Sequence, residues 1–139
     1  MNLQIIEEES QSINGFETVY LNKDNRQLNL SHISDNSCEL VIARNCLDNS
    51  ETPKETLASI CSKIRKGGSV VVSGVELRCF FKNALNGLVN DESVSFIVGK
   101  SLSLSTIDNV KDNLRKLGLT VKSSTINGVL YEITAERNA

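Results

Sequence analysis

The 139-residue sequence has little of several residue types that usually mark a function. It contains one histidine, one proline and no tryptophan, and its four cysteines include no pair at C-x-x-C spacing. Zinc sites are built from clusters of cysteine and histidine at short spacings, so this pattern speaks against a zinc site. The cysteines are Cys38, Cys46, Cys61 and Cys79. Three of them fall on faces predicted to be apolar, where cysteine behaves as a small hydrophobic residue.

Cys46 is the exception among the cysteines, because it follows the end of a predicted strand. This position could leave it partly exposed. A nucleophilic pair with His32 is an alternative that the sequence leaves open, although no third residue that would orient the histidine is evident. The simpler interpretation is a packed, inert thiol.

A charge surplus and long apolar runs are also absent. The chain carries 15 basic and 17 acidic residues, and the basic ones are scattered, which does not favour a nucleic-acid-binding surface. No apolar run approaches the roughly 20 residues needed to cross a bilayer, and the first residues include no basic leader followed by an apolar segment. We therefore expect a cytoplasmic protein with neither nucleic acid nor membrane as a partner. Its length predicts a single domain over residues 1–139.

Residues 35–75 are the most informative stretch, because they predict a strand, a helix and a second strand of a parallel sheet. The runs 38–43 and 69–75 are short, apolar and rich in β-branched residues, as in strands covered on both faces. Pro53 suits the first turn of the helix between them, because the missing N–H of proline costs nothing there. A parallel crossover of this kind is expected to be right-handed.

The predicted helix carries one apolar stripe, made of Leu57, Ile60, Cys61 and Ile64. The helical spacing of these residues indicates that the stripe packs on the sheet. Basic residues fill the expected last turn, and Gly67 and Gly68 are expected to end the helix.

Further elements are predicted on both sides of this unit. Short strands are expected over residues 3–6, 16–21 and 27–30, and a helix over residues 76–88. Residues 89–104 receive no assignment, because their alternating apolar positions fit a strand or an extended loop equally well.

The C-terminal third predicts a helix followed by a hairpin. Ser105 and Asp108 form the pattern of a capping box, and helical periodicity continues from there to Gly118. Two strand-like runs then flank Asn127 and Gly128, a strong signal for a tight antiparallel turn.

This order of elements resembles the second half of a class I S-adenosylmethionine-dependent methyltransferase. The local likeness is carried by the polar turn at 35–37, the apolar strand through Ala43, the strand end at 45–48 and the segment 65–68. The N-terminus resembles short members of the family, in which a strand of type LNLGCG precedes one of type GFxNVD. The resemblance implies an α/β, Rossmann-like three-layer sandwich with a mostly parallel sheet and an antiparallel C-terminal hairpin strand.

The sequence departs from this family at the positions that the resemblance assigns to the cofactor. Gln4 and Ile6 stand where the family has the glycines of its cofactor loop, and Glu7 follows them. Glycine is needed there because the backbone must turn tightly and approach the ligand. Tyr20 replaces the acidic residue that holds the ribose hydroxyls, and a phenol cannot supply the two acceptors of a carboxylate. Asn29 stands at the position of the aspartate that contacts adenine.

One catalytic feature of the family is missing as well. Where relatives read Leu-Glu-His at the end of the fourth strand, this chain has Leu47, Asp48 and Asn49. The general-base histidine is therefore absent.

Three hypotheses follow from the resemblance and its departures. The first is a degenerate methyltransferase-like module with a binding or structural role, no cofactor, and a protein partner or a second copy of itself. The alternative is an active S-adenosylmethionine-dependent enzyme with an unorthodox site, in which Asn45 and Asp48 position the acceptor and Asp48 accepts a proton. The third is a binder of another small ligand, with Tyr20 as one wall of the cleft.

Overall fold

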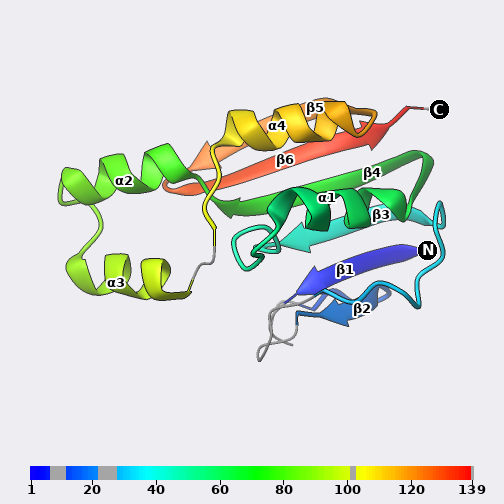
Figure 1. The fold of residues 1–139 in the computed structure, drawn as a ribbon, viewed down its shortest axis with the longest axis horizontal. Coiled ribbons are helices and arrows are strands. Elements are labelled where there is room, and N and C mark those ends of the chain that lie inside the picture. Colours follow the sequence, from blue (N-terminus) through cyan, green and yellow to red (C-terminus); the bar gives the residue numbers. More distant parts are fainter. Residues whose placement is uncertain (7–11, 22–27, 101–102, 139) are drawn as a thin grey trace.

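A computed structural model describes residues 1–6, 12–21, 28–100 and 103–138, with only the backbone of Lys100. In this part of the chain a six-stranded sheet is accompanied by four helices (Figure 1). The strands are β1 (Asn2–Ile6), β2 (Glu17–Tyr20), β3 (Cys38–Arg44), β4 (Ile64–Val75), β5 (Leu119–Asn127) and β6 (Leu130–Arg137). The helices are α1 (Pro53–Ser62), α2 (Leu77–Leu85), α3 (Asp91–Lys100) and α4 (Ile107–Lys116).

The sheet has the strand order β2-β1-β3-β4-β6-β5. The first four strands in that order run parallel, whereas β6 runs antiparallel to both β4 and β5. Gly128 has a φ of +65° in the turn between β5 and β6, a conformation that favours glycine. The expected α/β class, the mostly parallel sheet and the antiparallel C-terminal hairpin are therefore confirmed.

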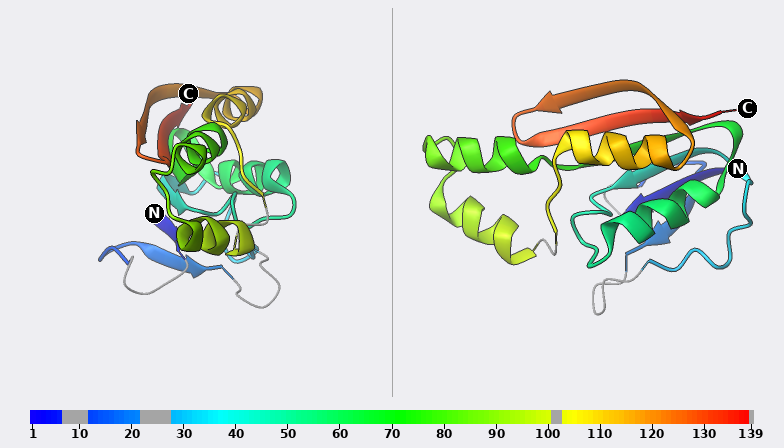
Figure 2. Two further views of the ribbon diagram at one scale, coloured as in Figure 1. Left: turned by 90° about the vertical axis from the view of Figure 1, so that its left-hand side faces the viewer. Right: turned by 45° about the horizontal axis from the view of Figure 1, so that its top comes forward.

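Helices α1 and α4 cover the same face of the sheet, as Figure 2 shows. Their apolar stripes pack against strand residues that alternate along the sheet. The buried residues of this layer include Leu57 and Ile60 from α1, Val110 and Leu114 from α4, and Val41, Ala43, Val70, Val72 and Ile133 from the strands. This packing explains why the apolar periodicity of both helices was visible in the sequence.

The opposite face of the sheet carries no helix in the described part of the chain. Its central side chains, Leu40, Ile42 and Val71, are half-buried, and polar side chains surround them. The connections that enter and leave β2 contain no helix in their described residues. The expected second helical layer is therefore not found among the residues that the structure describes.

The two glycines expected to end α1 lie instead inside β4. Helix α1 ends at Ser62, and Ile64 already pairs with Cys38 of β3. The register between the two strands shifts after Cys38, and Gly67 takes a φ of +80° at this irregularity. A Cβ on Gly68 would lie 2.8 Å from the carbonyl oxygen of Cys38, so a larger residue does not fit there. The predicted helix end was wrong, because a bulge and a helix cap both need glycine.

Three other local predictions are corrected. Residues 91–100, which the sequence left unassigned, belong to helix α3. The side chain that caps α4 is Thr106, whose Oγ1 accepts the N–H of Asn109 at 3.2 Å, whereas Ser105 forms an isolated bridge with Glu76. Residues 28–30 form no strand, and residue 27 of that predicted strand lies outside the described residues.

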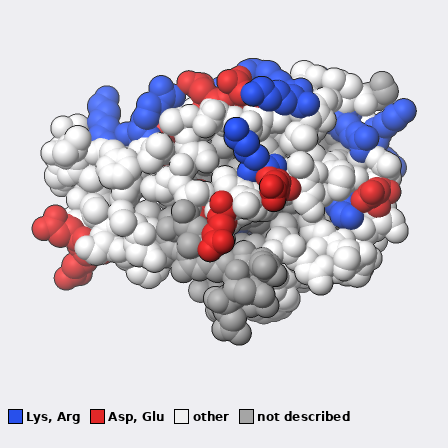
Figure 3. Space-filling view, viewed as in Figure 1, with Lys and Arg blue, Asp and Glu red and all other residues white. Residues whose placement is uncertain are grey.

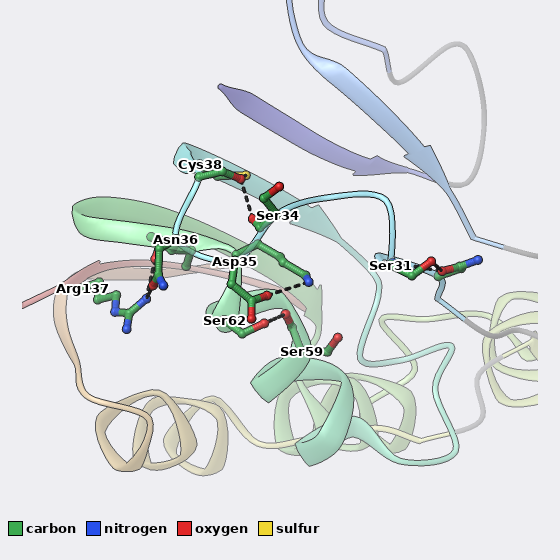
Figure 4. A network of polar contacts seen from close by, with 12 residues as sticks. Ser31, Ser34, Asp35, Asn36, Cys38, Ser59, Ser62 and Arg137 are labelled. Atoms are coloured by element: carbon green, nitrogen blue, oxygen red, sulfur yellow. Dashed lines mark hydrogen bonds and ion pairs between the residues drawn. The ribbon is translucent and has the colours of Figure 1, made fainter.

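The amino-terminal edge of the parallel strands is closed by polar contacts (Figure 4). The guanidinium of Arg137, at the end of β6, donates to the side chain of Asn36 and to the carbonyl of Ile64. Lys63 contacts Asp35 at 2.8 Å, and this hydrogen bond, with the lysine charge, holds the pKa of the Asp35 carboxyl below its ordinary value. These contacts belong to the edge away from the candidate site.

Candidate functional site at the carboxyl edge of the sheet

The carboxyl ends of β1, β3 and β4 meet at one edge of the sheet, which is where open α/β sheets bind ligands (Figure 1). The buried polar side chains of the described residues also gather on these strands and just beyond them. They are Gln4, Asp48, Asn49, Ser50 and Glu76. Their hydrogen-bond partners show whether each side chain holds the fold together or faces a ligand.

Gln4 lies in the middle of β1 and is completely buried. Its Nε2 donates to Thr18 Oγ1 at 2.8 Å, to the Ile13 carbonyl at 3.1 Å and to Ser12 Oγ at 3.2 Å, and its Oε1 accepts the N–H of Ile13 at 2.8 Å. The side chain thus binds the connection between β1 and β2 to the sheet. The sequence showed a glutamine at a glycine position, but it did not show these partners.

The other predicted cofactor positions do not share one environment. Ile6 is buried and pairs in register with Tyr20, whose side chain is 47% exposed at the end of β2. Asn29 is exposed in a turn, where its Oδ1 accepts hydrogen bonds from the backbone and hydroxyl of Ser31. Glu7 lies outside the described residues. Sheet pairing therefore brings Ile6 and Tyr20 together, whereas Asn29 is held by its own turn.

The turn after β3 contains Asn45, which takes a φ of +56°. Asparagine is one of the few residues that adopt this left-handed conformation without a large penalty. Its N–H donates to the Ser73 carbonyl at 2.9 Å, and its carbonyl accepts from the side chain of Asn49 at 2.8 Å. Asn49, which stands where the family has its histidine, therefore closes the turn through this hydrogen bond to Asn45.

Asp48 is 3% exposed and lies against β4. Its Oδ2 accepts the backbone N–H of Val75 at 2.9 Å. A Cβ on Gly74 would lie 2.9 Å from both carboxylate oxygens, so glycine leaves the space that the carboxylate occupies. The predicted proton acceptor thus joins the turn after β3 to the end of β4.

Glu76 is a buried residue of this edge that the sequence analysis did not single out. It is 1% exposed, its Oε1 accepts the N–H of Cys79 at 3.0 Å, and its Oε2 accepts that of Ile107 at 2.6 Å. The one available signal was an acidic residue between an apolar strand and a helix, which is a helix-capping position.

Tyr131 of β6 is 1% exposed, and its hydroxyl has no hydrogen-bond partner among the described residues. Burial raises the pKa of this phenol far above its ordinary value, and the charge of Asp48 acts in the same direction. The phenol is therefore neutral throughout the physiological pH range.

The simpler interpretation of Cys46, a packed thiol, is confirmed, and partial exposure is excluded. Its side chain is 1% exposed, because the turn after β3 folds into the core, and its Sγ donates to the Arg44 carbonyl at 3.6 Å. His32 is exposed in a turn on the connection between β2 and β3. Cys38 and Cys61 are buried as expected, whereas Cys79 is half-buried.

The described residues contain no group of three or more histidine, cysteine, aspartate or glutamate side chains arranged to hold a metal ion. No described helix has the length and apolar character needed to cross a membrane.

Neither a protein-family model nor a curated protein matches the sequence. Solved structures match the fold. An O-methyltransferase family protein from Burkholderia thailandensis superposes with a TM-score of 0.61 at 15% identity, over 88% of this chain and 36% of that one. A SAM-dependent methyltransferase from Thermotoga maritima has a TM-score of 0.58 at 14% identity, over 89% of this chain and 65% of that one.

A third match comes from the complex of the Haloferax volcanii Trm112 methyltransferase activator with a protein assigned as a methyltransferase. It has a TM-score of 0.61 at 10% identity and covers 94% of this chain and 64% of the other. The chain thus spans less than two thirds of these three proteins. At such low identity the matches define the fold, and this fold is that of class I S-adenosylmethionine-dependent methyltransferases.

Proposed function

We propose that this chain is a methyltransferase-like module that does not bind S-adenosylmethionine in the usual way and has a non-catalytic binding or structural role. The observation that carries the proposal is the side chain of Gln4. It stands where the resemblance has a glycine of the cofactor loop and is completely buried, and it makes three hydrogen bonds to the connection between β1 and β2 and one to Thr18 of β2. A ligand at this point would have to displace a satisfied polar group from the core, which costs free energy.

The residues at the end of β3 support the same proposal. Asp48 accepts a backbone N–H from β4, and Asn49 donates to the carbonyl of Asn45. These groups stabilise the fold at the positions where a working enzyme needs groups directed at its substrate. Protein partners fit a module of this kind, and one solved structure of the same fold is a complex with an activator protein.

The alternative is an active methyltransferase with an unorthodox site. It is favoured by Tyr20, which is half exposed beside Ile6, and by Asn45, whose left-handed backbone conformation lies at the end of β3. Left-handed residues other than glycine are enriched at ligand sites. In this alternative Asn45 and Asp48 position the methyl acceptor.

Calorimetric titration with S-adenosylmethionine and with S-adenosylhomocysteine separates the two. We expect no saturable heat at ligand concentrations up to about 1 mM, since each lost hydrogen bond weakens binding by roughly tenfold. Saturable binding of either compound in the micromolar range would overturn the proposal and favour the alternative. A Tyr20→Ala variant then shows whether the heat arises at the carboxyl edge, because binding there weakens when the wall formed by this side chain is removed.

A further inference from the structure

Helices α2 and α3 form an arm that projects beyond the carboxyl ends of β3 and β4 (Figure 1). The arm begins at Glu76, whose carboxylate caps α2, and it returns to the sheet at Ser103. The hydroxyl of Ser103 donates to the carbonyls of Leu47 and Ser50 at 3.0 and 3.1 Å. Hydrogen bonds thus hold both ends of the arm, and they fix its position at the edge of the sheet.

The arm exposes large apolar side chains that a helix on the sheet would bury. Phe81 and Leu85 lie one turn apart on α2 and are 47% and 87% exposed, and Leu88 in the following turn is 75% exposed. On α3, Phe96 is 67% exposed. We refer to these four residues as the arm patch. In contrast, only Phe80 of α2 is buried.

Large apolar side chains that are exposed near one another mark interaction sites on a protein surface. A standard interface takes roughly 800 Å² from each partner, so polar residues around the patch have to contribute to one as well. The surface of the arm is also not flat. An open hollow of about 500 Å³ on α3 is lined by Glu92, Ser93, Phe96 and Ile97. A side chain such as Leu85 of another molecule has the size and polarity to enter such a hollow.

The charges around the patch are arranged with opposite signs on the two helices. Arg78 and Lys82 lie one turn apart on α2, whereas Asp91 and Glu92 begin α3. Figure 3 shows basic side chains over the α2 side of the arm and acidic ones at its far tip. Arg78 is paired with Asp108, but Lys82, Asp91 and Glu92 have no ion pair with any described residue.

We propose that the arm patch is the interface of a homodimer, with the arm of a second copy as its occupant. A two-fold axis places α2 of each copy beside α3 of the other, so every contact occurs twice. Lys82 then meets Asp91 and Glu92 of the second copy, and Leu85 enters the hollow on α3. In this arrangement the charges of one arm are complementary to those of the other, which favours a second copy as the occupant. The inference goes beyond the proposed function and does not depend on the state of the cofactor edge.

Sedimentation equilibrium of the full chain, from about 5 to 200 µM, tests the proposal. We expect a dimer for the natural sequence and a monomer for Leu85→Asp, which places a charge in the apolar centre. The matched control is Leu117→Asp at the end of α4, where a leucine is 38% exposed at the end of the sheet opposite the arm. This variant is expected to remain dimeric. Circular dichroism confirms that both variants are folded.

A charge reversal tests the orientation of the two arms. Lys82→Glu should weaken dimerisation by about tenfold, and adding Glu92→Lys to it should restore the affinity. A natural chain that is monomeric at about 200 µM, or a Leu85→Asp variant that stays dimeric, overturns the proposal. If Glu92→Lys does not restore the affinity that Lys82→Glu removes, the two-fold arrangement is overturned. None of these results depends on cofactor binding, which the calorimetric titration measures separately.

Discussion

Glu76 and Ile107 are 31 positions apart in sequence, and the Oε2 atom of Glu76 accepts the backbone N–H of Ile107 at 2.6 Å. The other carboxylate oxygen accepts the N–H of Cys79. One buried side chain therefore caps the first turns of both α2 and α4, where helix dipoles favour an acceptor. Helix α2 begins the arm, and α4 follows the point where the chain comes back to the sheet. The Glu76 carboxylate therefore holds the two ends of the arm together.

Replacement of Glu76 should destabilise the protein more than replacement of an ordinary helix cap. We expect Glu76→Ala to lower the free energy of unfolding by about 2–4 kcal/mol, since two buried N–H groups lose their acceptor. Thr106→Ala, which removes one exposed hydrogen bond to the first turn of α4, should cost about 1 kcal/mol. Glu76→Gln should fall between the two, because it keeps one acceptor oxygen. Urea unfolding of the three variants checks this order, and equal losses for the first two would contradict it.

Gly74 should resist replacement by alanine, because its Cβ would lie 2.9 Å from both carboxylate oxygens of Asp48. Overpacking of this kind costs about 1–3 kcal/mol. The matched control is Gly99→Ala in α3, where a Cβ meets no atom within 4 Å. That variant should keep or raise stability by up to about 1 kcal/mol, because alanine favours helices more than glycine. Thermal unfolding of both variants gives the comparison.

A double-mutant cycle assigns the effect at Gly74 to its cause. If the clash with Asp48 is responsible, Gly74→Ala should cost less in an Asp48→Ala background, with a coupling free energy of about 1 kcal/mol or more. A Gly74→Ala penalty that is the same in both backgrounds would locate the strain elsewhere in the turn.

The sequence was sufficient to predict elements whose apolar spacing reflects packing on the sheet, such as β3, α1, β4 and α4. Helix α3 was missed for the corresponding physical reason. It does not pack on the sheet, so Val94, Phe96 and Val98 show no stripe of helical period. Gly67 was misassigned because a positive φ serves a bulge as well as a helix end.

The residues of the candidate site were singled out by the family resemblance, not by a local pattern. The structure places Gln4 in the middle of β1 and Asp48 in the turn after β3. Their partners come from other elements: Gln4 binds the segment before β2, and Asp48 binds the backbone of β4. The role of Glu76 depends on a contact with α4, which no local pattern encodes. Long-range hydrogen bonds thus decide what each polar residue does.

Alkaline pH should destabilise the protein through two buried acids. Burial raises the pKa of the Cys61 thiol to about 12, although Arg137 acts in the opposite direction, and burial raises that of Tyr131 still further. The ordinary pKa values of cysteine and tyrosine are about 8.5 and about 10. At a pH above these values the unfolded chain releases protons that the folded chain retains. The free energy of unfolding therefore falls with rising pH, by roughly 1 kcal/mol per pH unit for each group.

Tyr131→Phe separates the contributions of these two acids. The variant should be about as stable as the natural protein near neutral pH, because the lost hydroxyl has no described partner. Its stability should fall less steeply above about pH 10. Urea unfolding across this range, with tyrosinate absorbance followed in parallel, gives the measurement. An unchanged alkaline slope would show that Tyr131 already ionises in the folded protein.

The hydrogen bonds of Gln4 should make it a structural residue whose removal loosens the connection before β2. Gln4→Ala leaves the N–H and carbonyl of Ile13 and the hydroxyl of Thr18 without their partner, so we expect a loss of about 2–3 kcal/mol. The control is Asn29→Ala, which removes an exposed turn contact and should cost less than about 1 kcal/mol. Amide exchange at Ile13 should accelerate in the first variant and stay unchanged in the second. If Gln4→Ala instead retains full stability and slow exchange at Ile13, the side chain is dispensable to the fold, and the main support for a closed cofactor edge is lost.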